Sequence, residues 1–138
     1  MNQNNRERNI ADELARAERA FQALEVLVDH GFVNDAVSKL YYAFLYLVRA
    51  LLLTQGLEVR SQEGALRMLG QYFVKDGPLD RRATQLFAKL MKYREEADYN
   101  PTFDFAAEDL PGLRREVDEV SARIRALLEA AREGESQP

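Results

Sequence analysis

The segment from Leu40 to Leu53, which reads LYYAFLYLVRALLL, constrains the fold of this chain more than any other feature. Its single charge is Arg49, and apolar or aromatic residues occupy almost every side of the helix that it would form. A helix of this kind is stable in water only when neighbouring helices or a second subunit cover it. The segment falls short of the ~18 to 20 apolar residues that span a bilayer. We therefore expect the central helix of a bundle and no membrane span.

The rest of the chain also has a helical pattern, with apolar residues three and four positions apart. A first helix with an apolar stripe over 10–28 is expected to end at His30-Gly31, because glycine readily adopts the left-handed conformation that closes helices. Without a convincing strand, the sequence predicts an all-α, up-and-down bundle of four long helices and one short one. The second helix is expected to begin at the N-cap Asn34 and to end by Gly56, and the third to begin at Ser61 and to end at Asp76-Gly77-Pro78. The fourth is expected to run from Leu79 to Asp98, and the fifth to begin near Asp109 and Pro111.

Size and composition limit the kind of protein. The chain has 138 residues, 46% hydrophobic and 30% charged, so one domain over 1–138 is expected, with frayed ends at about 1–6 and 134–138. The net charge of −4 excludes a protein held to nucleic acid mainly by neutralising phosphates. No cysteine and only one histidine are present, which excludes disulfides and thiolate metal sites. The polar N-terminal residues do not have the pattern of a secretory signal, so a cytoplasmic protein is expected.

The most unusual polar feature is the sequence YREEADYNP at 93–101, at the expected end of the fourth helix. Arg94 and Asp98 are four residues apart on one helix face, so an ion pair worth ~0.2 to 0.5 kcal/mol is expected between them. Charge runs at helix ends usually serve solubility and capping. On that interpretation Arg94 is exposed, and its replacement by alanine changes the free energy of unfolding by no more than ~0.5 kcal/mol.

Four segments of the chain form a recognisable series: KLYYAFLYLVRALLL at 39–53, GLE at 56–58, FVKDG at 73–77 and REEADYNP at 94–101. In this order and spacing they resemble the HEPN family. The similarity covers about residues 8 to 130 and is greatest to small stand-alone prokaryotic HEPN proteins whose fourth helix ends in Arg-x-x-Ala-Asp-Tyr. The segment from Arg94 to Pro101 is the specific part of this resemblance.

The resemblance implies a helical bundle that forms a homodimer around the site region. It also implies a partner, a minimal nucleotidyltransferase encoded beside it, the two proteins being the halves of a toxin-antitoxin pair. Several HEPN branches are metal-independent ribonucleases whose site combines an arginine with a histidine that follows after four to six residues, from both subunits. In such a site the arginine holds a phosphate bidentately, and the histidine moves protons near neutral pH.

Arg94 matches the family's arginine, but Tyr99, Asn100 and Pro101 occupy the positions where the histidine would be. A tyrosine with an ordinary pKa of ~10 can orient a phosphate but is a poor general base. Two functions stay open. The first is an interaction module that binds a nucleotidyltransferase partner or a nucleotide through Arg94, Asp98 and Tyr99, with no metal or cofactor. The second is a metal-independent ribonuclease with a degenerate site, which binds RNA through Arg94 and uses Tyr99 in place of histidine.

Four other features have a structural and a functional interpretation. Arg49 either pairs with a buried acid or lines the same ligand-binding cleft as Arg94. His30 is expected to cap the first helix, not to carry protons. The aromatic residues of the apolar segment are expected to pack in the core or a dimer interface, not to stack on bases. The pairs Arg81-Arg82 and Arg114-Arg115 are too sparse for a nucleic-acid surface and are expected to be solvated.

Overall fold

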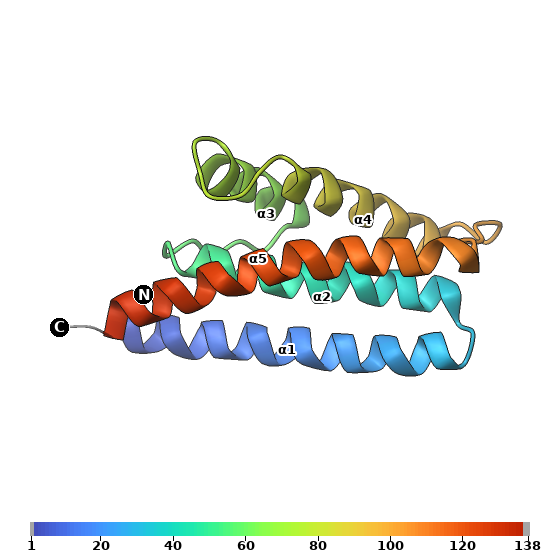
Figure 1. Cartoon of the computed structure of the whole chain (residues 1–138), viewed down its shortest axis with the longest axis horizontal. Coiled ribbons are helices and arrows are strands. Elements are labelled where there is room, and N and C mark those ends of the chain that lie inside the picture. The colour runs from blue at the N-terminus through green and yellow to red at the C-terminus, as the bar shows by residue number, and fades with distance from the viewer. Residues whose placement is uncertain (1, 137–138) are drawn as a thin grey trace.

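Five α-helices make up most of residues 2–136, the part of the chain that the computed structural model describes (Figure 1). No strand occurs in these residues, so the expected all-α class is confirmed. A π-helical turn extends the third helix, and a 3₁₀ turn precedes the fifth. The elements are α1 (Gln3–Asp29), α2 (Val33–Leu53), α3 (Gln62–Leu69), the π-helical turn (Gly70–Val74), α4 (Arg82–Tyr99), the 3₁₀ turn (Ala107–Asp109) and α5 (Leu110–Ser136).

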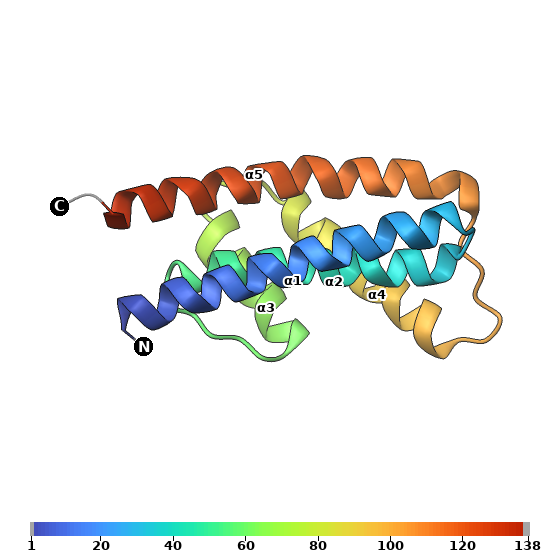
Figure 2. The same cartoon turned by 90° about the horizontal axis from the view of Figure 1, so that it is seen from below.

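The four long helices run up and down, and α2 lies among the others (Figures 1 and 2). It packs along α1 and also contacts α4, α5 and the short α3. In the core, the apolar faces of the neighbouring helices surround α2, which is itself apolar on most sides. The prediction that this segment forms the central helix is confirmed. Side chains of α2 that are completely buried include Leu40, Phe44, Leu47, Val48 and Leu52.

By length and composition alone, α2 could also cross a membrane, because the helix extends beyond the apolar segment on its N-terminal side. Most of its apolar part is buried inside the bundle, as in the core helix of a soluble protein. Each large apolar side chain buried in this way stabilises the fold by ~1.5 to 3 kcal/mol. The apolar character of α2 is thus accounted for by the core that it forms with its own chain.

One side of α2 is only half covered by the other helices. Ser38, Tyr42, Tyr46 and Arg49 lie on this side at steps of three and four, and each is half-buried. We call these four residues the α2 stripe. The apolar surface that could have required a second subunit is therefore covered mainly by the chain itself. What stays accessible on α2 is mainly polar and aromatic, with Val33 and Leu45 as partly buried aliphatic residues.

The turn after α1 and the end of α2 follow the expected glycines. His30 caps α1 as expected, with Nδ1 2.8 Å from the carbonyl oxygen of Val26. Gly31 follows at φ +77°, a conformation that an L side chain rarely adopts. α2 ends at Leu53, a turn before Gly56, whose φ is +73°.

Asn34 does not cap α2, and this sequence prediction is wrong. The helix begins one residue earlier, at Val33, without a side-chain cap. Asn34 instead fixes the segment that follows α4: its Nδ2 donates to the carbonyl oxygen of Phe103 (2.9 Å), and its Oδ1 accepts from the backbone N–H of Phe105 (3.0 Å). A partner distant in the sequence competes successfully with the local capping interaction.

The boundaries of α3 and α4 are close to those expected. Ser61 caps α3, because its Oγ accepts a 3.0 Å hydrogen bond from the backbone N–H of Gly64. α4 begins at Arg82, three residues later than the expected Leu79. At this start, Oδ1 of Asp80 accepts a 3.0 Å hydrogen bond from the backbone N–H of Arg82. The extended backbone of Asn100 before Pro101 ends α4 as expected.

The two ends of the chain are helical as far as they are described. Oδ1 of Asn2 accepts the backbone N–H of Asn5 at 2.8 Å and caps α1, and α5 continues to Ser136. Residues 1, 137 and 138 lie outside the described part. The fraying expected at about 1–6 and 134–138 stays a prediction.

Candidate functional site

Arg94 is the centre of a polar and aromatic cluster near the C-terminal end of α4. Its Nη2 donates a 3.0 Å hydrogen bond to Oε1 of Gln62, and its Nη1 lies 3.7 Å from Oδ2 of Asp98. The predicted ion pair between Arg94 and Asp98 is confirmed. The expected exposure of Arg94 is wrong, because the start of α3 packs against this end of α4 and leaves the side chain only 12% exposed.

Two tyrosine rings lie close to the guanidinium of Arg94. Its Cζ is 5.1 Å from the ring centroid of Tyr41 and 5.9 Å from that of Tyr99. Both distances allow cation-π attraction. Tyr41 is buried, whereas Tyr99 is 75% exposed. The Arg94 guanidinium therefore connects a ring of the core to a ring on the surface.

Gln62 completes the surroundings of Arg94, although nothing in the sequence singled it out. It is the first residue of α3, directly after the N-cap Ser61. Its Oε1 accepts a 2.6 Å hydrogen bond from the hydroxyl of Tyr41 as well as the bond from Arg94, so both lone pairs of this oxygen are used. No local signal could have found this contact, because Gln62 and Arg94 are 32 residues apart.

Ser38 holds the other side of the cluster. Its Oγ donates a 3.1 Å hydrogen bond to Oδ1 of Asp98, which ties the end of α4 to α2. Asn34, one turn earlier on α2, holds the segment after α4. The structure thus brings Arg94, Asp98 and Tyr99 together on a helix end that is fixed by two other helices. We define the Arg94 cluster as Ser38, Tyr41, Gln62, Arg94, Asp98 and Tyr99.

The pKa values of two groups in the Arg94 cluster are shifted. Burial raises the pKa of Tyr41, because it disfavours the phenolate more than the nearby Arg94 cation favours it. Desolvation tends to lower the pKa of Arg94, but Tyr42, Tyr41 and Asp98 outweigh this effect, so the pKa lies above its ordinary value. At physiological pH, Arg94 is therefore a cation and Tyr41 a neutral hydrogen-bond donor.

Chemically, the Arg94 cluster offers a binding group for an anion. Nε of Arg94 is buried without a hydrogen-bond partner, and an unpartnered buried donor of this kind often marks a functional position. The single histidine of the chain, His30, is the C-cap of α1 and bonds a backbone carbonyl of that helix, so it is not a member of the Arg94 cluster. Among the side chains that the structure describes, those of residues 2–134, no group of three or more His, Cys, Asp or Glu is arranged to hold a metal ion. A proton transfer at this cluster would depend on Tyr99 or on a carboxylate.

A groove of about 320 Å³ between α1 and α2 lies beside the Arg94 cluster. It is connected to the cluster through Tyr42, whose ring meets the ring of Tyr41 edge-on with centroids 5.0 Å apart. Its charged lining is entirely basic, which suits a negatively charged ligand. The groove is lined by Arg16, Arg19, Ala20, Ala23, Lys39, Tyr42 and Tyr46.

Arg49 does not belong to the Arg94 cluster. Its Nη2 lies 3.3 Å from Oε1 of Glu13, a buried acid on α1, and Arg16 donates to the same oxygen at 3.0 Å. Of the two interpretations of Arg49, pairing with a buried acid is confirmed. No interaction joins Arg49 to Arg94, so the idea that both line one cleft is not supported by their contacts.

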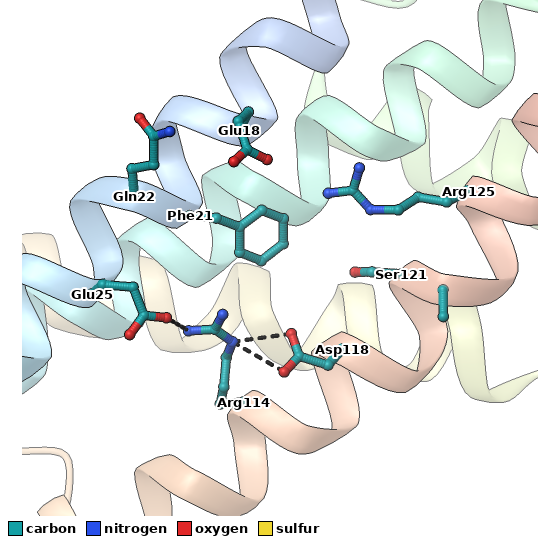
Figure 3. Close-up of a pocket in the computed structure, with 9 residues that line it drawn as sticks. Glu18, Phe21, Gln22, Glu25, Arg114, Asp118, Ser121 and Arg125 are labelled. Carbon is teal, nitrogen blue, oxygen red and sulfur yellow. Dashed lines mark hydrogen bonds and ion pairs between the residues drawn. The ribbon is translucent and has the colours of Figure 1, made fainter.

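A further groove, of about 400 Å³, lies between α1 and α5, away from every predicted site residue (Figure 3). Arg114 crosses one end of it and pairs with Glu25 at 2.7 Å and with Asp118 at 3.0 Å. The guanidinium groups of Arg114 and Arg125 both lie over the ring of Phe21, at 5.5 and 5.8 Å. Arg114 was expected to be solvated, but it is partly buried because it joins the two helices.

A family model described as the HEPN domain matches residues 10–134. The chain belongs to the HEPN family. All members of the Arg94 cluster lie inside the matched range, so the cluster is part of the HEPN domain itself. The resemblance inferred from the Arg94 to Pro101 segment is confirmed at the level of the family.

Two similar proteins come from Methanocaldococcus jannaschii. The one named "Putative toxin MJ0142" is 33% identical over 96 residues, which are 70% of this chain and 65% of that protein. The one named "Putative toxin MJ0605" is 30% identical over 115 residues, 81% of this chain and 86% of that protein. A Thermotoga maritima protein named "UPF0332 protein" is 27% identical over 114 residues, 83% of this chain and 86% of that protein. This HEPN chain thus spans somewhat less than two thirds of the first relative and most of the other two.

Proposed function

We propose that this HEPN protein is one half of a toxin-antitoxin pair in the cytoplasm, and that its Arg94 cluster binds the phosphate of a nucleotide. The observation that carries this proposal is the guanidinium of Arg94, which Gln62 and two tyrosine rings hold in place beside an exposed Tyr99. Two relatives whose names describe toxins support the first part.

Binding of a phosphate at Arg94 follows from charge and preorganisation. A guanidinium binds phosphate oxygens through charge-assisted hydrogen bonds, and less entropy is lost when its position is already fixed. The basic groove beside the cluster adds Lys39, Arg16 and Arg19 for further phosphate groups, and Tyr42 and Tyr46 for a base. Because the whole chain carries a charge of −4, such binding is a local property of this surface.

We also propose that the protein acts as a homodimer and binds a minimal nucleotidyltransferase. The α2 stripe and Tyr99 supply accessible tyrosines close to the Arg94 cluster, and tyrosine is enriched in protein interfaces. A gene for a small nucleotidyltransferase next to the gene of this protein would support the pairing.

The second candidate function is a metal-independent ribonuclease that uses Tyr99 in place of histidine. The observation in its favour is the contact between the Tyr99 ring and the Arg94 guanidinium, which would bring a hydroxyl close to a bound phosphate. Against it, the cluster has no histidine to move protons near neutral pH, and the carboxylate of Asp98 repels a phosphate. We therefore rank binding above cleavage.

Titration calorimetry with ATP and with adenosine tests the proposed binding. ATP is expected to bind the wild-type protein at least ~10-fold more tightly than adenosine, because the phosphates make the main contacts. Arg94→Met is expected to remove this difference, whereas Arg123→Met, at an exposed arginine that pairs with Asp80 on another surface, keeps it. Equal binding of ATP by wild type and Arg94→Met would show that Arg94 is not the phosphate ligand.

A further inference from the structure

A second polar cavity, of about 230 Å³, lies between α1, the C-terminal part of α2 and the connector that follows α2. It shares no residue with the Arg94 cluster, and only Arg16 with the basic groove beside that cluster. The binding proposed for this cavity uses other residues and so does not rest on the proposed function. Its size is below the ~300 to 1,000 Å³ of pockets for drug-sized ligands, which limits an occupant to a small molecule. The cavity is lined by Asn9, Asp12, Glu13, Arg16, Arg49, Leu53, Leu57, Glu58, Val59 and Arg60.

Glu13 is the unusual group of this cavity. Among residues 2–134, the part of the chain whose side chains are described, it is the one charged residue that is almost completely buried, at 5% exposure. Arg16 and Arg49 both approach its Oε1, at 3.0 and 3.3 Å, while its Oε2 is buried and has no hydrogen-bond partner. An ion pair with a purely structural role would be expected to use both oxygens, because an unsatisfied buried acceptor is destabilising. Oε2 of Glu13 is therefore an acceptor whose hydrogen-bonding capacity is unused.

Charged side chains of Arg49 and of the connector after α2 have few or no ion-pair partners. Arg49 has Glu13 as its only ion-pair partner in the described part of the chain and remains 31% exposed. Glu58 and Arg60 are exposed and have no ion-pair partner among residues 2–134. Both signs of charge are therefore available around the cavity, three arginines and three acids in all.

This balance decides what kind of molecule the cavity suits. The acids would repel a simple anion, and the arginines would repel a simple cation, so either ion would bind only weakly. A molecule with an ammonium and a carboxylate can use both sets. Leu53, Leu57 and Val59 add an aliphatic part to the lining.

We propose that this cavity is a binding site for a free α-amino acid with an aliphatic side chain. The carboxylate binds Arg49 and Arg60, the ammonium group donates to Glu13 and Glu58, and the side chain packs on Leu57. The site gives Arg49 a ligand-binding role apart from Arg94. It would make the stability of the domain depend on the concentration of the amino acid.

Calorimetric titration with three probes of the same carbon skeleton tests the proposal. L-leucine carries both charges, 3-methylbutylamine lacks the carboxylate, and 4-methylpentanoate lacks the ammonium group. L-leucine is expected to bind with a Kd of ~1 mM or lower, and each analogue at least ~10-fold more weakly. Binding of either analogue as tightly as L-leucine, or no binding of L-leucine up to ~10 mM, would overturn the proposal.

Three variants assign the binding to the cavity. Arg49→Met is expected to weaken L-leucine binding at least ~10-fold. Because this variant also leaves Glu13 with one partner fewer, Arg60→Met tests the same step at an exposed position that supports no part of the core, and is expected to weaken binding as well. Arg123→Met removes an equal charge elsewhere and should leave the Kd unchanged. Unchanged binding in Arg60→Met and in a folded Arg49→Met would show that the amino acid binds somewhere else.

Discussion

Oε1 of Gln62 accepts hydrogen bonds from both Arg94 and Tyr41, and so joins the first turn of α3 to the end of α4 and the middle of α2. The three groups come from three helices, and the Gln62 oxygen is bonded to both of the others. The position of the Arg94 guanidinium therefore depends on the packing of α3, a helix of only eight residues.

A double-mutant cycle should detect the contact between Gln62 and Arg94. Arg94→Ala is expected to lower the free energy of unfolding by ~1.5 to 3 kcal/mol, because a partly buried, charge-assisted hydrogen bond is lost. Gln62→Met should cost ~1 to 2 kcal/mol, and the double variant should cost less than the sum by at least ~0.5 kcal/mol. Urea unfolding measures all three. Arg123→Ala, an exposed control, should stay within ~0.5 kcal/mol, and strictly additive costs would contradict the coupling.

The raised pKa of Tyr41 predicts a loss of stability in alkali. In the unfolded chain this phenol has an ordinary pKa of ~10, whereas burial raises the pKa in the folded protein. Above pH ~10 the unfolded state therefore loses the proton first, and the free energy of unfolding falls as the pH rises through the folded pKa. Urea unfolding between pH 8 and pH 11 should show a shallower decline for Tyr41→Phe than for wild type. Tyr72→Phe, at an exposed tyrosine, is the control, and an equal decline in all three proteins would refute the assignment.

Asn34→Ala should loosen the segment after α4 without shortening α2. Both bonds of Asn34 go to the backbone at Phe103 and Phe105, so the variant is expected to cost ~1 to 2 kcal/mol. Circular dichroism should show an unchanged helix content, because Asn34 caps no helix. Hydrogen exchange of the Phe105 amide should become faster, and an unchanged exchange rate would mean that this contact does not hold the segment in solution.

Purified protein should not cleave RNA at a useful rate, with or without Mg²⁺. Proton transfer by a positioned acid or base contributes ~10² to 10⁴-fold to such reactions, and the Arg94 cluster contains no histidine, the side chain that most often performs this task near neutral pH. Labelled RNA incubated with wild type, Arg94→Ala and Tyr99→Phe, in EDTA and then in Mg²⁺, measures the activity. Metal-free cleavage by wild type that disappears in both variants, but persists in Tyr72→Phe, would establish the ribonuclease with Tyr99 in the place of histidine.

The proposed homodimer should be visible by sedimentation at micromolar concentration. We expect the α2 stripe and Tyr99 at the interface, so Tyr46→Asp should shift the protein toward the monomer by introducing a charge among half-buried aromatic residues. Tyr72→Asp, at an exposed tyrosine of the π-helical turn, should leave the sedimentation coefficient unchanged. A wild-type protein that sediments only as a monomer would rule out this dimer.

Much of the fold could be predicted from the sequence because its signals are local. Apolar residues at steps of three and four, the cap at Ser61 and the closing glycine at Gly31 each act within one or two turns of helix. The apolar segment from Leu40 to Leu53 also determined by itself which helix lies in the centre. It is apolar on almost every side, whereas each of the other helices has a polar face that must contact water. Arg94, Asp98 and Tyr99 are neighbours on one helix end, but the resemblance to the HEPN family, and not a local signal, singled them out as a site.

Only the tertiary structure decided how these residues are used. Whether Arg94 is exposed depends on where α3 packs, and whether Asn34 caps a helix or holds Phe105 depends on a segment 71 residues away. The partner of Arg49 was likewise open until α1 placed Glu13 beside it. Such contacts form only when helices pack, since the energy of a hydrogen bond or an ion pair depends on the distance in space between two groups and on their removal from water.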